Sequence, residues 1–131
     1  MTPLRREIRD CLSESSGGES GGFSGCFVFP PAFTGFQGHF PDRPVLPAVC
    51  TVQAVLVLMA AVGLPAGRLE QIVSAKWFAP VAPGVKVTFV GEARREEDGR
   101  LTARVRISGE AGKIAELTLR VALAAAGQVA P

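Results

Sequence analysis

Residues 38–62 read GHFPDRPVLPAVCTVQAVLVLMAAV, a proline-rich loop that leads directly into an apolar segment. Pro47 stands at the end of the loop, where a helix favours proline in its first turn. Residues 48–62 are apolar on nearly every face of such a helix, so we expect other parts of the fold to cover it on most sides. At 15 residues, with Gly63 and Pro65 after it, the segment is short of a membrane span.

Strands are predicted on both sides of this helix. Residues 23–29 alternate with a period of two and end at Pro30-Pro31. After the helix, four further strands are predicted, over residues 71–78, 85–95, 101–107 and 115–123. The last two alternate apolar with polar side chains, so each has one buried and one wet face. Turns are predicted at Glu96-Glu97-Asp98-Gly99, which carries an Asp-Gly hairpin signal, and at Glu110-Ala111-Gly112.

This order of elements predicts the fold class. One strand is followed by the apolar helix and then by four strands in hairpin connection. The apolar surface of the helix and the apolar face of the sheet are both buried if the sheet curls around the helix. We therefore expect an α+β fold with a central helix.

The N-terminal part of the chain differs in composition. Leu4 and Ile8 recur at helical spacing among charged residues, which predicts a short amphipathic helix. Residues 13–22 read SESSGGESGG and predict a flexible, low-complexity linker. We therefore expect residues 1–22 to be an appendage and residues 23–131 to form the compact domain.

The composition fits one globular domain and excludes several classes of protein. The 131 residues are 47% hydrophobic, and the formal charge of +2 lacks the basic excess of a nucleic-acid-binding protein. No apolar run follows the N-terminal arginines, so no signal peptide is expected. Cys11, Cys26 and Cys50 form no CxxC motif, and their odd number favours a reducing, cytoplasmic setting. With a single histidine in the chain, we expect neither a metal nor another cofactor.

His39 is that single histidine, and it lies in the loop before the apolar helix. A neutral imidazole there is well placed to move a proton beside a polarised carbonyl. The backbone N–H groups of Ala48 and Val49 can receive a developing oxyanion, helped by the positive end of the helix dipole. A histidine that only stabilises the turn by hydrogen bonding is the structural alternative.

The segment 36–49 resembles the signature of the bacterial 3-hydroxyacyl-acyl-carrier-protein dehydratases of the FabA/FabZ type. The resemblance rests on Gly38-His39-Phe40-Pro41, on Pro44-Val45-Leu46-Pro47 and on the helix that follows. Residues 76–84, KWFAPVAPG, are similar to the family's Pro-x-x-Pro-Gly step. The resemblance implies a hotdog fold, an antiparallel sheet wrapped around a long helix, and a homodimer with active sites at the subunit interface.

The resemblance also implies roles for individual residues. His39 matches the base that removes the proton α to the thioester carbonyl. Gln53 stands fourteen positions later, where the family has an acidic residue contributed across the dimer, and Ala48 replaces the turn glycine. The expected catalytic residues are therefore His39 and Gln53. The residues expected to bind the acyl thioester of an acyl-carrier protein or of coenzyme A are Gly38, Phe40, Pro47, Ala48 and Val49.

Gln53 leaves more than one reaction possible, because an amide forms hydrogen bonds but has no proton to give at neutral pH. The chain is expected to be a dehydratase-like lyase of fatty-acid or related lipid or polyketide synthesis. A thioesterase, in which Gln53 orients a water, and a non-catalytic acyl-binding hotdog are alternatives. Gln53 can also have a purely structural role, satisfying a backbone group or pairing with its twin across a dimer axis.

Other side chains near the motif have simpler interpretations. Cys50 is expected to be a small buried hydrophobe rather than a nucleophile. Asp42 follows His39 too closely to replace a carboxylate from across the dimer, and Arg43 either fixes the loop, contacts a phosphopantetheine arm or is simply solvated. A set of basic residues is either a patch for an acidic carrier protein or ordinary solvated charge: Arg68, Lys76, Arg94 and Arg95.

Overall fold

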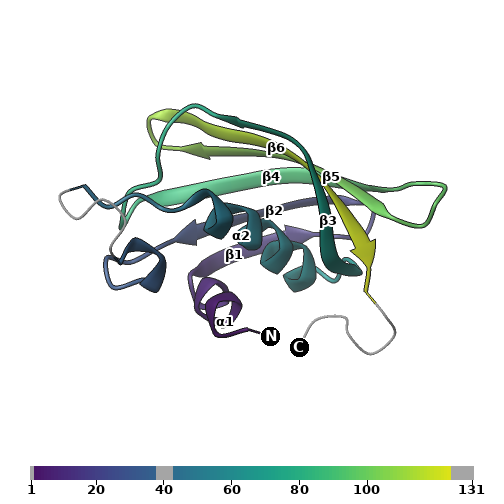
Figure 1. Ribbon diagram of the computed structural model, residues 1–131, viewed down its shortest axis with the longest axis horizontal. Coiled ribbons are helices and arrows are strands. Elements are labelled where there is room, and N and C mark those ends of the chain that lie inside the picture. Colours follow the sequence, from purple (N-terminus) through teal and green to yellow (C-terminus); the bar gives the residue numbers. More distant parts are fainter. Residues whose placement is uncertain (1, 38–42, 125–131) are drawn as a thin grey trace.

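The computed structural model describes residues 2–37 and 43–124, which form a six-stranded antiparallel sheet and two α-helices (Figure 1). The strand order in the sheet is β1-β2-β4-β5-β6-β3. In chain order, the elements are α1 (Pro3–Asp10), β1 (Leu12–Gly17), β2 (Gly22–Val28), the 3-10 helix η1 (Thr34–Phe36), α2 (Ala48–Ala61), β3 (Ala66–Trp77), β4 (Lys86–Arg95), β5 (Leu101–Gly109) and β6 (Gly112–Leu123).

Helix α2 lies within the curve of the sheet (Figure 1) and supplies much of the core. Its residues from Cys50 to Met59 are buried, except Gln53. The aromatic rings of Phe27, Phe29 and Phe89 lie in the same core. The expected α+β fold, a sheet curled around an apolar helix, is therefore confirmed. Neither helix in the described part of the chain is long and apolar enough to cross a membrane.

The sheet connections differ in one respect from the prediction. The hairpins β4–β5 and β5–β6 are present, and Gly99 takes the left-handed conformation (φ 88°) that the first turn requires. However, β3 and β4 do not form a hairpin, because β3 pairs with β6 and β4 pairs with β2. The segment between β3 and β4 contains Pro80 and Pro83, which have no N–H to give to a ladder, and it connects two separated strands of the sheet.

The prediction of a flexible linker over residues 13–22 is wrong in its first half. Residues from Leu12 to Gly17 form β1, which pairs antiparallel with β2. Gly17 has a φ of 108°, and a Cβ there would lie 2.3 Å from the Gly22 carbonyl oxygen, so this turn requires glycine. A ladder of backbone hydrogen bonds holds β1, and a serine-rich composition gives no signal for it.

Helix α1 is present as predicted, but it is not an appendage. Ile8 is 0% exposed and belongs to the hydrophobic core, and α1 packs against α2. The hydroxyl of Thr2 caps the helix by accepting a hydrogen bond from the Arg5 N–H at 3.2 Å. The compact domain therefore includes the N-terminal helix.

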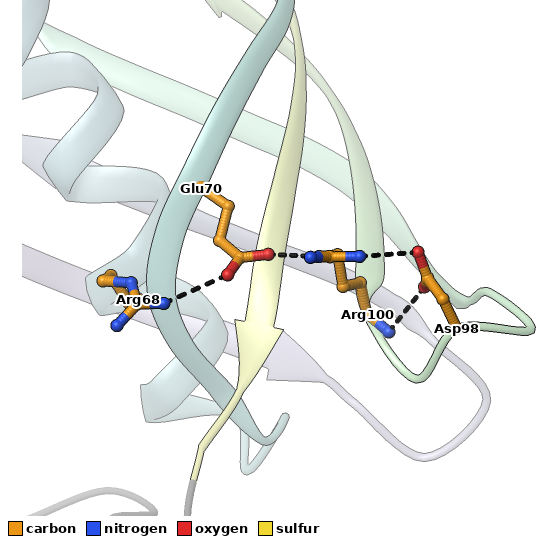
Figure 2. Close-up of polar contacts among 4 residues, drawn as sticks. All are labelled: Arg68, Glu70, Asp98 and Arg100. Carbon is orange, nitrogen blue, oxygen red and sulfur yellow. Dashed lines mark hydrogen bonds and ion pairs between the residues drawn. The ribbon is translucent and has the colours of Figure 1, made fainter.

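An ion-pair network on the surface joins β3 to the β4–β5 turn (Figure 2). Glu70 lies between Arg68 and Arg100, and Arg100 also binds Asp98 at 2.8 Å. The hydrogen bond from Arg100 is the main reason why the pKa of Glu70 is lowered. Because these side chains are exposed, we expect the network to help align the strands rather than to add much stability.

Candidate functional site

Three of the expected site residues, His39, Gly38 and Phe40, lie outside the described residues, as does Asp42. The described residues on both sides of this segment make backbone hydrogen bonds. Before it, at the end of η1, the N–H of Gln37 donates to the Thr34 carbonyl at 3.0 Å. After it, near the start of α2, the N–H of Leu46 donates to the Val81 carbonyl at 2.9 Å. The Leu46 bond therefore ties the second flank to the segment after β3, whereas the Gln37 bond closes the last turn of η1.

The start of α2 is open to solvent. Pro47 is the N-cap residue, and its carbonyl accepts from the N–H groups of Cys50 (3.0 Å) and Thr51 (3.3 Å). The N–H groups of Ala48 and Val49 have no acceptor within the helix, since the first turn of any helix lacks one. Val49 is 60% exposed although it is apolar. Two donors with a partial positive charge are thus available to a carbonyl oxygen.

A cavity of about 380 Å³ lies beside this helix start, and we name it the helix-start cavity. The last residue of β3 and the segment that follows it form one wall of the cavity, which is apolar. The lining residues are Leu46, Ala48, Thr51, Trp77, Phe78, Ala79, Pro80 and Val81. The expected site residue Ala48 is one of them. The wall residues 77–81 were not expected in the site, although they belong to the KWFAPVAPG step that carries part of the resemblance.

Thr51 stands out in the wall of this cavity. It is 1% exposed, and its hydroxyl has no hydrogen-bond partner among the described residues. Buried hydroxyl groups are nearly always paired, so an unpaired one carries a cost in stability.

A larger hollow of about 620 Å³ lies elsewhere, over β3 to β6, and it has charged walls and no residue of α2. An acyl chain is apolar, and we therefore take the helix-start cavity as the candidate site.

Gln53 lies on a different face of α2. Two helical positions separate it from Thr51, which is a rotation of about 200° around the axis. Its side chain is half-buried, and its Oε1 accepts a hydrogen bond from Nε of Arg5 at 2.5 Å. Within one chain, Gln53 and the helix-start cavity therefore face different directions. Arg5 was missed by the sequence analysis, because it is 48 positions away in a segment interpreted as an appendage.

Helix α1 also contacts the segment that precedes His39. The carboxylate of Glu7 accepts a hydrogen bond from the backbone N–H of Thr34 at 2.7 Å. Thr34 opens η1, whose Phe36 is buried. One short helix thus holds both Gln53 and the chain that leads to the candidate base.

Cys50 is 3% exposed, and burial, reinforced by the charge of Glu7, raises the pKa of its thiol. A buried, neutral thiol packs as a small hydrophobe, which agrees with the prediction for Cys50. The described residues contain no cluster of three or more His, Cys, Asp or Glu side chains that could hold a metal ion.

The four basic residues considered as a carrier-protein patch do not act together. Arg68 is bound to Glu70 (Figure 2). Arg94 and Arg95 are consecutive in β4, so their side chains point to opposite faces of the sheet. Lys76 shares the larger hollow with Arg94, but carboxylates of the strands also line it. This distribution favours ordinary solvated charge.

Comparison with known proteins gives matches over most of the chain. A model of the family described as "ApeI-like: ApeI dehydratase" matches residues 17–116. The 3-hydroxyacyl-[acyl-carrier-protein] dehydratase FabZ of Thermus thermophilus is 34% identical over 93 residues, which cover 63% of this chain and 66% of the relative. The same enzyme of Polynucleobacter asymbioticus is 28% identical over 95 residues, 66% of this chain and 64% of the relative. The matched region thus spans slightly less than two thirds of these relatives.

Solved structures support the fold. The dehydratase heterocomplex ApeI:P from Xenorhabdus doucetiae matches with a TM-score of 0.68 at 19% identity, covering 85% of this chain and 96% of that chain. A hypothetical thioesterase with coenzyme A from Streptococcus pneumoniae TIGR4 matches with a TM-score of 0.63 at 10% identity, covering 93% and 97%. The likeness to these folds confirms the expected hotdog architecture.

Proposed function

Because the chain belongs to the ApeI-like family of dehydratases, we propose that it removes water from 3-hydroxyacyl thioesters to give trans-2-enoyl thioesters. The observation that carries this proposal is the open start of α2 beside the helix-start cavity. The N–H groups of Ala48 and Val49 provide donors for the thioester carbonyl, and the apolar wall from Trp77 to Val81 suits an acyl chain. The FabZ relatives act on 3-hydroxyacyl groups carried by acyl-carrier protein, which supports this substrate class.

In the proposed reaction, His39 is the base. It takes a proton from C2 while the thioester oxygen accepts hydrogen bonds at the start of α2, so that charge builds up where donors are already in place. The C3–O bond then breaks, and the imidazolium returns its proton to the departing hydroxyl, which leaves as water. Gly38, Phe40 and Pro47 are proposed to line the path of the substrate.

Gln53 has an altered acid role in this proposal. Its amide donates a hydrogen bond to the 3-hydroxyl group but transfers no proton. Because Gln53 faces away from the helix-start cavity of its own chain, we propose that it serves the cavity of a second subunit. This arrangement needs a dimer in which each site combines residues of both chains.

Strand β3 provides a surface for that dimer. It is an edge strand, and both of its faces are exposed over most of its length. Ile72, Val73 and Trp77 are 49%, 47% and 43% exposed, an unusual amount of apolar surface for an edge. We propose a homodimer through this edge. The ApeI:P relative is a heterocomplex, so a different hotdog subunit with its own carboxylate is the alternative partner.

A thioesterase is the second candidate, and Gln53 is the observation that favours it. An amide is better suited to orient a water against a thioester carbonyl than to act as an acid. In that case, the products are a free acid and a free thiol, whereas dehydration leaves the thioester intact.

One assay separates these functions. The purified full-length protein is incubated with 3-hydroxyacyl and trans-2-enoyl thioesters of several chain lengths, and both enoyl formation or hydration and release of free thiol are recorded. We expect interconversion of the two thioesters without thiol release, and a loss of about 10²–10⁴-fold in kcat for His39→Ala. Thiol release would favour the thioesterase, and full activity of His39→Ala would exclude His39 as the base.

A further inference from the structure

The contact between Arg5 and Gln53 concerns the position where the family resemblance implies an acid. We propose that Arg5 is a positioning residue that makes side chain 53 a fixed, neutral hydrogen-bond donor and excludes a proton-donating acid there. This inference rests on the proposed function, since it specifies how Gln53 takes part in the reaction.

The geometry fixes the direction of the amide. A guanidinium group has only donors, so the atom that faces Nε of Arg5 at 2.5 Å is the amide oxygen of Gln53. The Nε2 group of Gln53 then points away from Arg5 and presents two N–H donors. Without Arg5, an amide in a polar site can turn over and present its oxygen instead. Arg5 thus decides which end of Gln53 a substrate hydroxyl meets.

The position of Arg5 is itself well defined. Its side chain is half-buried, its backbone N–H is bound by the Thr2 hydroxyl, and α1 is anchored in the core by the fully buried Ile8. The hydrogen bond is charge-assisted, and such bonds are shorter and stronger than those between neutral groups. The guanidinium therefore belongs to the packed domain rather than to a mobile tail.

The same contact has an electrostatic consequence. A carboxylate within hydrogen-bonding distance of an arginine has its pKa lowered by about 1–3 units. A glutamate at position 53 would therefore be ionised at neutral pH and would have no proton to give. Glutamine keeps the hydrogen bond to Arg5 and remains a donor on its other side.

Glu7 opposes this effect, since its charge raises the pKa of Cys50 one turn before position 53, but Arg5 is the group that is hydrogen-bonded to Gln53. Glu7, on the same helix as Arg5, has its carboxylate bound to the N–H of Thr34. Strand β2 has no charged residue, and β1 brings only Glu14, which is exposed. The charged side chains of β3 are also exposed, and solvent screens them: Arg68, Glu70 and Lys76.

The first test measures a pKa and does not depend on catalysis. Gln53→Glu is made alone, together with Arg5→Gln, and together with Arg6→Gln, a matched control because Arg6 is an exposed arginine of the same helix. The carboxyl of Glu at position 53 is titrated by carbon NMR. We expect a pKa below the usual value of about 4.3 in Gln53→Glu, a rise of about 1–3 units on adding Arg5→Gln, and no comparable rise on adding Arg6→Gln. Equal pKa values in all three proteins would overturn the inference.

The second test measures turnover at native Gln53. With a 3-hydroxyacyl-pantetheine substrate, we expect Arg5→Gln to lower kcat about tenfold, the loss expected for one charge-assisted hydrogen bond, with a smaller change in KM. Arg5→Lys, which can still donate to the amide oxygen, should recover part of the loss, and Arg6→Gln should leave kcat unchanged. An unchanged kcat in Arg5→Gln would contradict the positioning role.

The two tests separate the failure of this inference from the failure of the proposed function. If the native protein turns over no thioester but the carboxyl at position 53 depends on Arg5, the function fails and the coupling stands. If the native protein is active and neither variant series responds to Arg5, the function stands and the inference fails. Should Gln53→Glu not fold, the side-chain amide NMR signals of Gln53 replace the titration, and they should shift in Arg5→Gln but not in Arg6→Gln.

Discussion

The unpaired hydroxyl of Thr51 allows a prediction in which stability rises on mutation. Thr51 is 1% exposed in the wall of the helix-start cavity, and its Oγ1 has no partner among the described residues. A buried polar group without a hydrogen bond costs about 1–3 kcal/mol. Thr51→Val keeps the shape of the side chain and replaces only the hydroxyl by a methyl group, and the two residues have similar helix propensity. We therefore expect Thr51→Val to increase the free energy of unfolding by about 1 kcal/mol.

Urea denaturation at neutral pH measures this change, and the thermal midpoint should rise by roughly 3–5 °C for a domain of this size. Thr51→Ser is the matched control, because it keeps the hydroxyl and removes the methyl group. It should lower stability by about 1 kcal/mol through lost burial. If Thr51→Val instead lowers stability by 1 kcal/mol or more, the hydroxyl has a partner, such as the carbonyl one turn before it, and the reasoning is wrong.

Three further predictions concern the parts of the fold around the site. Ile8→Ala should lower the free energy of unfolding by about 2–5 kcal/mol in urea denaturation, because Ile8 is fully buried, and a change near zero would mean that α1 is dispensable. Burial raises the pKa of Cys11 to about 11 from 9.0, so native Cys11 keeps its proton where the unfolded thiol loses it. Stability should therefore fall as pH rises from 9 to 11, and denaturation curves of Cys11→Ala over this range should lack that component. Val73→Lys, on the exposed edge β3, should shift the oligomer toward monomers in native mass spectrometry, whereas an unchanged dimer would place the interface elsewhere.

The sequence predicts those elements whose side chains differ between buried and exposed positions. Helix α2 is recognisable because its sequence is apolar on nearly every face. Strand β5 is recognisable because Leu101 and Val105 alternate with polar and charged residues. Strand β1 has no such contrast, since Leu12 is its one residue that is not exposed and its pairing relies on backbone atoms. The low complexity of residues 13–22 therefore predicts a linker where the chain forms a strand.

The candidate site divides in the same way. The start of α2 could be predicted from local sequence, because Pro47 and the apolar segment that follows it are close in the chain. The contact of Arg5 with Gln53 joins two helices that are 48 positions apart. Nothing in either segment indicates the other, since an arginine on an amphipathic helix is usually solvated. Only the packing of α1 on α2 brings them together.

We propose that this fold disfavours an acid at position 53, where the resemblance implies one. Position 53 is five residues from the start of α2, about 7.5 Å along the axis. Because the effect of the helix dipole falls off within the first turn, the positive charge that acts on position 53 is that of the Arg5 guanidinium. A guanidinium group stabilises the ionised form of a carboxylic acid beside it, so an acid at position 53 would lose its proton. An amide has no charge to gain or lose, so glutamine keeps its N–H donors beside the guanidinium, whereas a carboxylic acid there would lose the one proton it could donate.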